Sequence, residues 1–241
     1  MSNHKTKCIA VIPARGGSKR IPKKNIKDFF GKPLIAYSIE VALQSKLFDK
    51  VIVSTDDTEI ASIAKEYGAH VPFLRPKELS DDFSGTDVVI EHTLNFLKQE
   101  GEIFDFCCTI YATAPLLKKE YLIHGFTNLK ESNAKQAFSA TSMPFPIKRT
   151  FKIDENGRCE MFYPEHYYTR SQDLEEAYQD AGQFYWTNLH KASNKIMFSE
   201  DSIPIILPRH LVQDIDTLED WNRAEIMYKV IKESKQYEYL I

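Results

Sequence analysis

The chain has 241 residues, of which 43% are hydrophobic and 27% charged, with a formal net charge of −3. This length suits one large α/β domain that can carry a smaller excursion, and the composition is that of a soluble globular protein. No apolar run approaches the roughly 18 residues that a membrane-spanning helix needs, and the slightly acidic balance argues against a broad nucleic-acid-binding surface. We therefore expect a cytoplasmic protein with no membrane and no nucleic acid as partner.

Strand-like and helix-like segments alternate through the first half of the chain. The run "CIAVI" (8–12) predicts a buried strand, and apolar residues at helical spacing predict a helix over 32–46. "VIVS" (51–54) predicts a second strand. "TDDTEIASIAKEYG" (55–68) predicts a helix, because its acidic start and its final glycine are typical of helix ends.

Three further segments extend this alternation. "HVPFL" (70–74) predicts a third short strand, helical spacing predicts a helix over 85–97, and "FDFCCTIYATAP" (104–115) predicts a fourth strand buried on both faces. Strands that alternate with helices indicate a parallel sheet with helices on both faces. Ligands collect at the carboxyl ends of such strands, so we expect "PARGGSKR", "STDD" and "YATAP" to share one edge.

The composition changes in the second half of the chain. Residues 142–192 are rich in aromatics and proline, and Asn156-Gly157 predicts a hairpin turn. The chain then returns to a strand at "IPIILP" (203–208) and to a helix over 218–231. We therefore expect an α/β domain of residues 1–141 and 193–241, with residues 142–192 inserted as an excursion from the sheet.

The most unusual segment is "IPARGGSKRIPKKN" (12–25), which follows the first strand. Residues 1–27 contain eight Lys or Arg and no Asp or Glu. The glycine pair lets backbone amides turn toward an anion, and neighbouring cations add positive charge. The segment matches neither the GxxxxGK[ST] phosphate loop nor the GxGxxG fingerprint. It predicts a polyphosphate site, with a solvated basic loop as the alternative.

A pair of carboxylates follows the last predicted strand in "QDIDT". Asp214 and Asp216 are two residues apart, so in extended geometry both side chains face the same side and can meet one hard cation. Mg²⁺ bound by one or two carboxylates and by substrate phosphates is common in nucleotide chemistry. The alternative is that Asp216 or Thr217 only caps the following helix.

Cations and amides also gather in the aromatic-rich stretch. The group consists of Lys148, Arg149, Arg170, Gln172 and Gln183. Such side chains suit an acidic, polyhydroxylated ligand, and Arg170 can grip a carboxylate with two hydrogen bonds. A basic rim or a dimer contact is an equally good interpretation.

Taken together, "IPARGGSKRIPKKN", "VIVSTDD", "LRPKEL" and "QDIDT" closely resemble the CMP-sialic acid synthetase family of nonulosonate cytidylyltransferases. The resemblance covers essentially the whole chain. It implies a three-layer α/β/α nucleotidyltransferase fold with a mostly parallel sheet and a small β-rich dimerisation excursion that also binds sugar. It further implies a homodimer, Mg²⁺ as cofactor, and transfer of CMP from CTP to an acidic nine-carbon sugar with release of diphosphate.

The resemblance also implies roles for particular positions. The triphosphate would be bound by Arg15, Lys19 and Lys24, with Ala14, Gly16, Gly17 and Ser18 forming the loop. Cytosine and ribose would be held by Asn25, Arg75, Ser84 and Thr86. Asp214 and Asp216 would bind Mg²⁺. The sugar would be bound by Tyr111, Thr113, Lys148, Arg149, Arg170, Gln172 and Gln183.

The acceptor sugar can be narrowed by the same resemblance. "FPIKR", "TRSQDLEEAYQDAGQFYW" and "LPRHLVQDIDT" are most similar to family members that activate pseudaminic acid for flagellin and cell-surface glycosylation. Sialate enzymes usually carry "LQPTSP" where this chain has "IYATAP", so Tyr111 replaces a glutamine that contacts the acceptor. We therefore expect pseudaminic acid, with sialic or legionaminic acid as alternatives. A non-catalytic nucleotide- or nucleic-acid-binding protein that uses the same basic loop is the competing hypothesis from another class.

Overall fold

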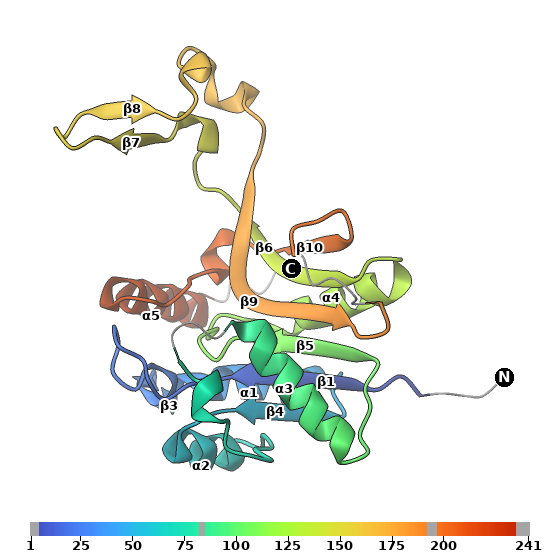
Figure 1. Ribbon diagram of the computed structural model, residues 1–241. Helices are drawn as coiled ribbons and strands as arrows, with labels where there is room; N and C mark the ends of the chain where they lie inside the picture. The colour runs from blue at the N-terminus through green and yellow to red at the C-terminus, as the bar shows by residue number, and fades with distance from the viewer. Residues whose placement is uncertain (1–4, 82–84, 192–196, 235–241) are drawn as a thin grey trace.

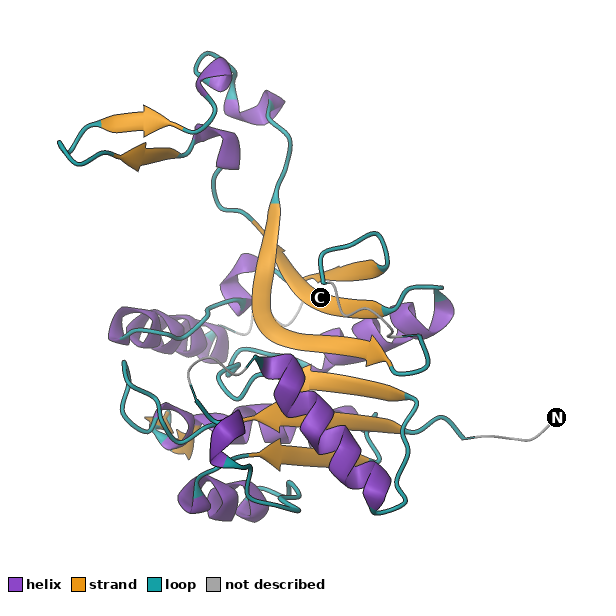
Figure 2. Cartoon of the chain, viewed as in Figure 1, coloured by secondary structure: helices purple, strands orange, loops and turns teal. Residues whose placement is uncertain are grey.

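The computed structural model describes residues 5–81, 85–191 and 197–234, and it has a six-stranded sheet at its centre (Figure 1, Figure 2). The strand order is β10-β6-β9-β5-β1-β4, and β9 alone runs antiparallel to its neighbours. The strands are β1 Cys8–Pro13, β4 Lys50–Ser54, β5 Phe106–Ile110, β6 Gln136–Ser142, β9 Tyr178–Asn188 and β10 Ser202–Ile206.

Helices cover both faces of this sheet because side chains alternate along each strand. Cys8, Ala10 and Ile12 of β1 pack toward α1, α2 and α4, whereas Ile9 and Val11 pack toward α3. The helices are α1 Leu34–Ser45, α2 Thr58–Glu66, α3 Thr86–Gln99, α4 Lys119–Glu131 and α5 Leu218–Glu233. The predicted three-layer α/β/α fold with a mostly parallel sheet is confirmed. Within the described residues, no helix has the length and apolar character to cross a membrane.

Most of the elements predicted from local patterns are present, but the prediction of a third strand at residues 70–74 is wrong. Of "HVPFL", only His70 pairs with the sheet, through an isolated bridge to Ile52 at the free edge of β4. Pro72 has no N–H to donate, so the ladder stops there. Helix α4 and strand β6, which pack against each other, correspond to no element predicted from the sequence.

Residues 143–177 leave the sheet and project from one side of the molecule (Figure 1); we call them the arm. The arm contains a ribbon of β7 Phe151–Ile153 and β8 Cys159–Met161. Gly157 has a φ of +74° in the connection, which confirms the predicted hairpin turn. Within the predicted excursion of 142–192, residues 178–188 form β9 and pair with β5 and β6. The division into two functional domains stays a prediction.

The antiparallel strand β9 is fixed in the core by Trp186. This side chain is fully buried, its ring stacks on Phe48 at a centroid distance of 5.2 Å, and its Nε1–H donates to the carbonyl of Leu122 in α4 at 3.1 Å. Gly125 of α4 lies over the ring of Trp186 and over that of Phe184, also in β9. A Cβ atom added at Gly125 would lie 3.0 Å from a ring carbon of Phe184 and 3.1 Å from one of Trp186. Helix α4 therefore approaches the sheet as closely as it does because position 125 has no side chain.

We predict that Gly125→Ala destabilises the protein although alanine is the better helix former. The helix-propensity gain is about 1 kcal/mol, whereas overpacking against two buried rings costs about 1–3 kcal/mol, so a small net loss in the free energy of unfolding is expected. Chemical denaturation measures it, with Thr127→Ala at an exposed position of the same helix as the control. A Gly125→Ala variant more stable than the wild type would contradict the close packing.

Candidate active site

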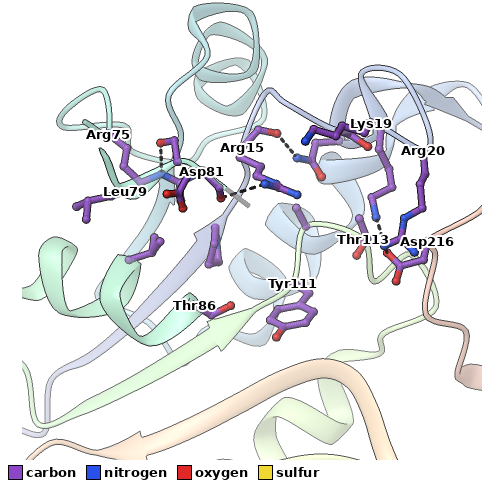
Figure 3. Close-up of a pocket in the computed structure, with 17 residues that line it drawn as sticks. Arg15, Lys19, Arg20, Arg75, Leu79, Asp81, Thr86, Tyr111, Thr113 and Asp216 are labelled. Atoms are coloured by element: carbon purple, nitrogen blue, oxygen red, sulfur yellow. Dashed lines mark hydrogen bonds and ion pairs between the residues drawn. The ribbon is translucent and has the colours of Figure 1, made fainter. Parts of the chain in front are cut away.

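A cavity of about 550 Å³ opens at the carboxyl ends of β1 and β5 (Figure 3). The loop after β1, the segment after β5, the first turn of α3 and Asp216 contribute to its wall. "PARGGSKR" and "YATAP" therefore meet at one edge of the sheet, as the expected parallel topology required.

The loop after β1, residues 14–25, is held by the acidic residues of "STDD" that precede α2. The backbone N–H of Gly16 donates to the carboxylate of Asp56 at 3.0 Å. Asp57 caps α2 by accepting two backbone N–H groups of its first turn. A Cβ atom on Gly16 would lie only 2.7 Å from Oδ2 of Asp57. The sequence analysis gave neither aspartate a role in the site, although both lie in the motif that it placed at this edge.

The same loop is closed from within by Asn25. This side chain is buried, and its Nδ2 donates to the carbonyl of Arg15 at 2.9 Å. At the other end, the N–H of Ala14 donates to the carbonyl of Ser54, which continues the pairing of β1 with β4. The conformation of the loop therefore depends on the bonds of Ala14 and Gly16 near its start and of Asn25 at its end.

Two cations of the loop pair directly with a carboxylate in the wall of the cavity. Arg20 and Lys24 lie 3.0 and 3.3 Å from Oδ1 of Asp216. Lys24 also donates to the carbonyl of Ile215, the residue before Asp216. This hydrogen bond ties the loop to the segment that precedes α5. Arg20 lines the cavity although no site role was assigned to it; its membership of the same basic run is the signal that could have indicated one.

A buried arginine forms another part of the wall. Arg75 is 5% exposed, its Nε donates to Oγ of Ser80 at 3.0 Å, and its guanidinium lies 3.7 Å from the Asp56 carboxylate. Burial lowers the pKa of Arg75, while Asp56 acts in the opposite direction. Because a guanidinium stays protonated in proteins, Arg75 provides a fixed positive charge beside the loop.

The two carboxylates of "QDIDT" have different surroundings. Ile215, which lies between them in sequence, is fully buried. Asp216 lines the cavity, whereas Asp214 is not among the lining residues. The pKa of Asp214 is raised, first because protein atoms remove part of its hydration and then because Asp216 is close. Thr217 caps α5 in a capping box, so the cap is Thr217 and Asp216 stays available to the cavity.

This chemistry fits a divalent cation that shares its ligands with a substrate. No group of three or more metal-binding side chains occurs in the part of the chain that the structure describes. Two carboxylates beside a basic loop are nevertheless enough for Mg²⁺, which usually keeps phosphate and water oxygens among its ligands. Burial and, next, the charge of Asp216 both disfavour the ionised form of Asp214, and a bound cation would favour it.

The cavity brings most of the predicted site residues together. Those that line it are Arg15, Ser18, Lys19, Lys24, Asn25, Arg75, Thr86, Tyr111, Thr113 and Asp216. Ala14, Gly16 and Gly17 shape the loop without lining the cavity, and Ser84 lies outside the described residues. Gln183 is 2% exposed and is not part of the wall, because its Nε2 donates to the carbonyl of Leu211 in the core.

The remaining predicted sugar ligands lie on the arm and away from the cavity (Figure 1). Lys148 pairs with Glu175, Arg149 donates to the carbonyl of Thr169, and Arg170 makes two hydrogen bonds with Asp173. Gln172 is exposed beside Arg170. A single copy of the chain does not bring these four side chains to the cavity, and their role stays a prediction.

Comparison with known proteins first defines the class. The fold is that of the nucleotidyltransferases: a solved CMP-2-keto-3-deoxy-manno-octonic acid synthetase complexed with CTP matches with a TM-score of 0.64 at 17% identity, over 93% of this chain and 99% of the other. A family model described as cytidylyltransferase matches residues 9–217. The chain belongs to the cytidylyltransferase family.

Two curated relatives place the chain more closely within this family. It is 48% identical to a pseudaminic acid cytidylyltransferase of Campylobacter jejuni, over 95% of this chain and 99% of the relative. It is 32% identical to a CMP-N,N'-diacetyllegionaminic acid synthase of Legionella pneumophila, over 94% of this chain and 98% of the relative.

The two adjacent loop glycines should respond differently to the same substitution. We predict that Gly16→Ala weakens binding of inorganic triphosphate by about tenfold, because the new Cβ must displace either the loop or the Asp57 cap. Gly17→Ala is the matched control, since a Cβ there meets nothing within 4 Å. Isothermal titration calorimetry compares the two variants. Equal affinities would show that the Gly16–Asp57 contact does not shape the anion site.

Proposed function

We propose that this chain transfers CMP from CTP to pseudaminic acid and releases diphosphate. The observation that carries the proposal is the cavity whose wall combines the cations Arg15, Lys19, Arg20 and Lys24 with the carboxylate of Asp216, which pairs with Arg20 and Lys24. Membership of the cytidylyltransferase family and the 48% identity to a pseudaminic acid enzyme support the same reaction.

In this reaction the anomeric hydroxyl oxygen of the sugar forms a bond to the α-phosphorus of CTP. The bond from that phosphorus to the bridging oxygen breaks on the opposite side, and diphosphate leaves with the electron pair. Arg15, Lys19 and Lys24 hold the triphosphate and offset the charge that develops on the leaving oxygens. The proton of the hydroxyl passes to water, which Asp214 or Asp216 orients. Catalysis then depends mainly on positioning and charge.

We place Mg²⁺ at Asp214 and Asp216. When bound, the ion would supply positive charge to the phosphate oxygens and help to align them. Asp216 faces the cavity and Asp214 lies beside it, so the pair provides the carboxylate share of a site completed by substrate oxygens.

The nucleoside and the sugar would occupy different ends of the cavity. We place cytosine and ribose against Arg75, Thr86 and Asn25, which all line the cavity. Tyr111 and Thr113 follow β5 at the other side of Arg15, where we place the acceptor (Figure 3). Tyr111 offers an aromatic ring where sialate enzymes usually offer an amide, which favours pseudaminic acid over sialic acid.

The arm supports a homodimer. It exposes large apolar side chains, among them Phe145 at 78%, Ile153 at 70% and Tyr168 at 91%. A protein surface seldom leaves such a group uncovered unless it is an interaction site. In a dimer, Lys148, Arg149, Arg170 and Gln172 could serve the site of the second copy. CTP as substrate also favours a cytoplasmic location.

A direct assay tests the reaction class and the acceptor separately. With CTP and Mg²⁺, we expect diphosphate release with pseudaminic acid to exceed release with sialic or legionaminic acid by about tenfold or more in kcat/KM. Turnover of another sugar alone would contradict the acceptor but keep the cytidylyltransferase. CTP binding without turnover of any of the three sugars would instead favour the non-catalytic nucleotide-binding alternative.

The second test separates the role of Asp216 in catalysis from its role in folding. Asp216→Asn should reduce kcat by about a hundredfold or more, whereas loss of a half-exposed ion pair should cost less than about 1 kcal/mol of stability. Asp201→Asn is the control, because Asp201 is similarly exposed and pairs with Lys135 at 2.6 Å. Mn²⁺ binding in the presence of CTP, followed by electron paramagnetic resonance, reads the metal site directly. Full activity in Asp216→Asn would remove the metal assignment.

A further inference from the structure

Strand β9 contains a large irregularity beside the cavity. Asp180 of β9 is paired with Ala140 of β6, and Tyr185 is paired with Phe138, so residues 181–184 all stand opposite Ser139. We call residues 181–184 the β9 bulge. The Ser139 hydroxyl accepts two successive N–H groups of the bulge, each at 3.1 Å. Bulges re-aim side chains and are frequent next to active sites.

The β9 bulge lies close to two parts of the proposed sugar site, the segment of Tyr111 and the loop of Asp214. The carbonyl of Gln183 accepts the N–H of Tyr111 at 2.9 Å, at the point where the chain leaves β5 for the cavity. Gly182 has a φ of +62°, and a Cβ atom there would lie 3.9 Å from Cγ of Asp214. The bulge is thus hydrogen-bonded to the segment that carries Tyr111, and Gly182 lies near the side chain of Asp214.

Asp180 closes the bulge with two hydrogen bonds. Its Oδ1 accepts the N–H of Gly182 at 2.9 Å, and its Oδ2 accepts the hydroxyl of Tyr185 at 2.6 Å. Tyr185 is 8% exposed, and the pKa of its hydroxyl is raised by burial, by Tyr111 and by Asp180, so it remains a donor at neutral pH. One carboxylate therefore fixes both the backbone of the bulge and a buried ring.

That buried ring supports the aromatic side chain in the cavity. The rings of Tyr185 and Tyr111 lie 5.2 Å apart at 52°. Tyr111 lines the cavity on the side opposite Arg75 and Lys19, next to Thr113 in the same segment (Figure 3). A shift of Tyr185 would move Tyr111 without touching the cationic loop after β1.

We propose that Asp180 is a positioning residue for the acceptor sugar, acting through Tyr185 and the β9 bulge on Tyr111. The inference rests on the proposed transfer to pseudaminic acid. Asp180 itself does not line the cavity, so its effect is on the placement of the Tyr111 ring that the sugar contacts. We place the nucleotide against the loop after β1 and Arg75. Among the described residues, neither of these has a hydrogen bond to the side chain of Asp180 or Tyr185.

Asp180→Asn provides the main test. An asparagine removes the negative charge and replaces one acceptor oxygen by an NH₂ donor, so the two charge-assisted hydrogen bonds to Gly182 and Tyr185 are weakened. We expect the KM for pseudaminic acid to rise about tenfold while the KM for CTP changes less than about twofold. Tyr185→Phe removes the other partner of the same bond and should give a similar split. The double variant should be little worse than either single one, because both remove one interaction.

The control is Tyr178→Phe. It removes another tyrosine-to-carboxylate hydrogen bond of β9, from Tyr178 to Glu176 at 2.8 Å, outside the bulge. Both KM values should stay unchanged in this variant. Equal rises of both KM values in Asp180→Asn, or a fall in melting temperature with neither KM changed, would overturn the proposal and leave Asp180 a purely structural role.

A spectroscopic measurement keeps this inference separate from the reaction itself. With 3-fluorotyrosine at position 111, the ¹⁹F resonance should shift in Asp180→Asn and Tyr185→Phe but not in Tyr178→Phe. If the wild type turns over no sugar, the proposed function fails while the ¹⁹F shift still supports the positioning of Tyr111. An unchanged resonance in Asp180→Asn would overturn the positioning role even in an active enzyme.

Discussion

A loop rich in like charges keeps one conformation only if fixed counter-charges oppose it, and this requirement shapes the whole cavity. Behind the loop, Asp56 accepts the N–H of Gly16 and faces the buried Arg75. In front, Asp216 lies against Arg20 and Lys24. Carboxylates from two distant segments thus offset repulsion within the basic run, and the parallel sheet brings those segments to one edge. The loop can therefore keep one conformation because its own charges are already balanced in part.

The antiparallel strand β9 is the second feature on which the site depends. It joins β5 to β6 in the sheet, and Trp186 anchors it to α4. Its other end leads into the arm (Figure 1). Between these two parts, the β9 bulge is hydrogen-bonded to Tyr111 and lies near the side chain of Asp214. One strand therefore connects the core, the candidate acceptor end and the surface that we assign to the second copy of the chain.

The parts of the fold that could be predicted are those with local signals. β1, β4 and β5 are continuous apolar runs, and α2 has an acidic N-terminus and a closing glycine, so neighbours in sequence were sufficient. "HVPFL" has the composition of a strand, but the ladder ends at Pro72, and only the free edge of β4 is available to His70. Strand β9 was assigned to the excursion because its aromatics resemble those of the arm. Its pairing with β5 and β6 depends on residues far away in the chain.

Residue type and spacing alone indicate which chemistry is available: a basic loop with two glycines, a pair of carboxylates in "QDIDT", and a group of cations in the aromatic-rich stretch. The basic loop does meet Asp216 of the carboxylate pair in one cavity. Only the tertiary structure decided that Gln183 is a core residue and that the arm cations are partnered away from the cavity. It also decided that Asp56 and Asp57 shape the loop and that Asp180 closes the β9 bulge. Each of these outcomes depends on which segments pack together. The local spacing of residues does not specify burial or hydrogen bonds to backbone groups that are distant in the sequence.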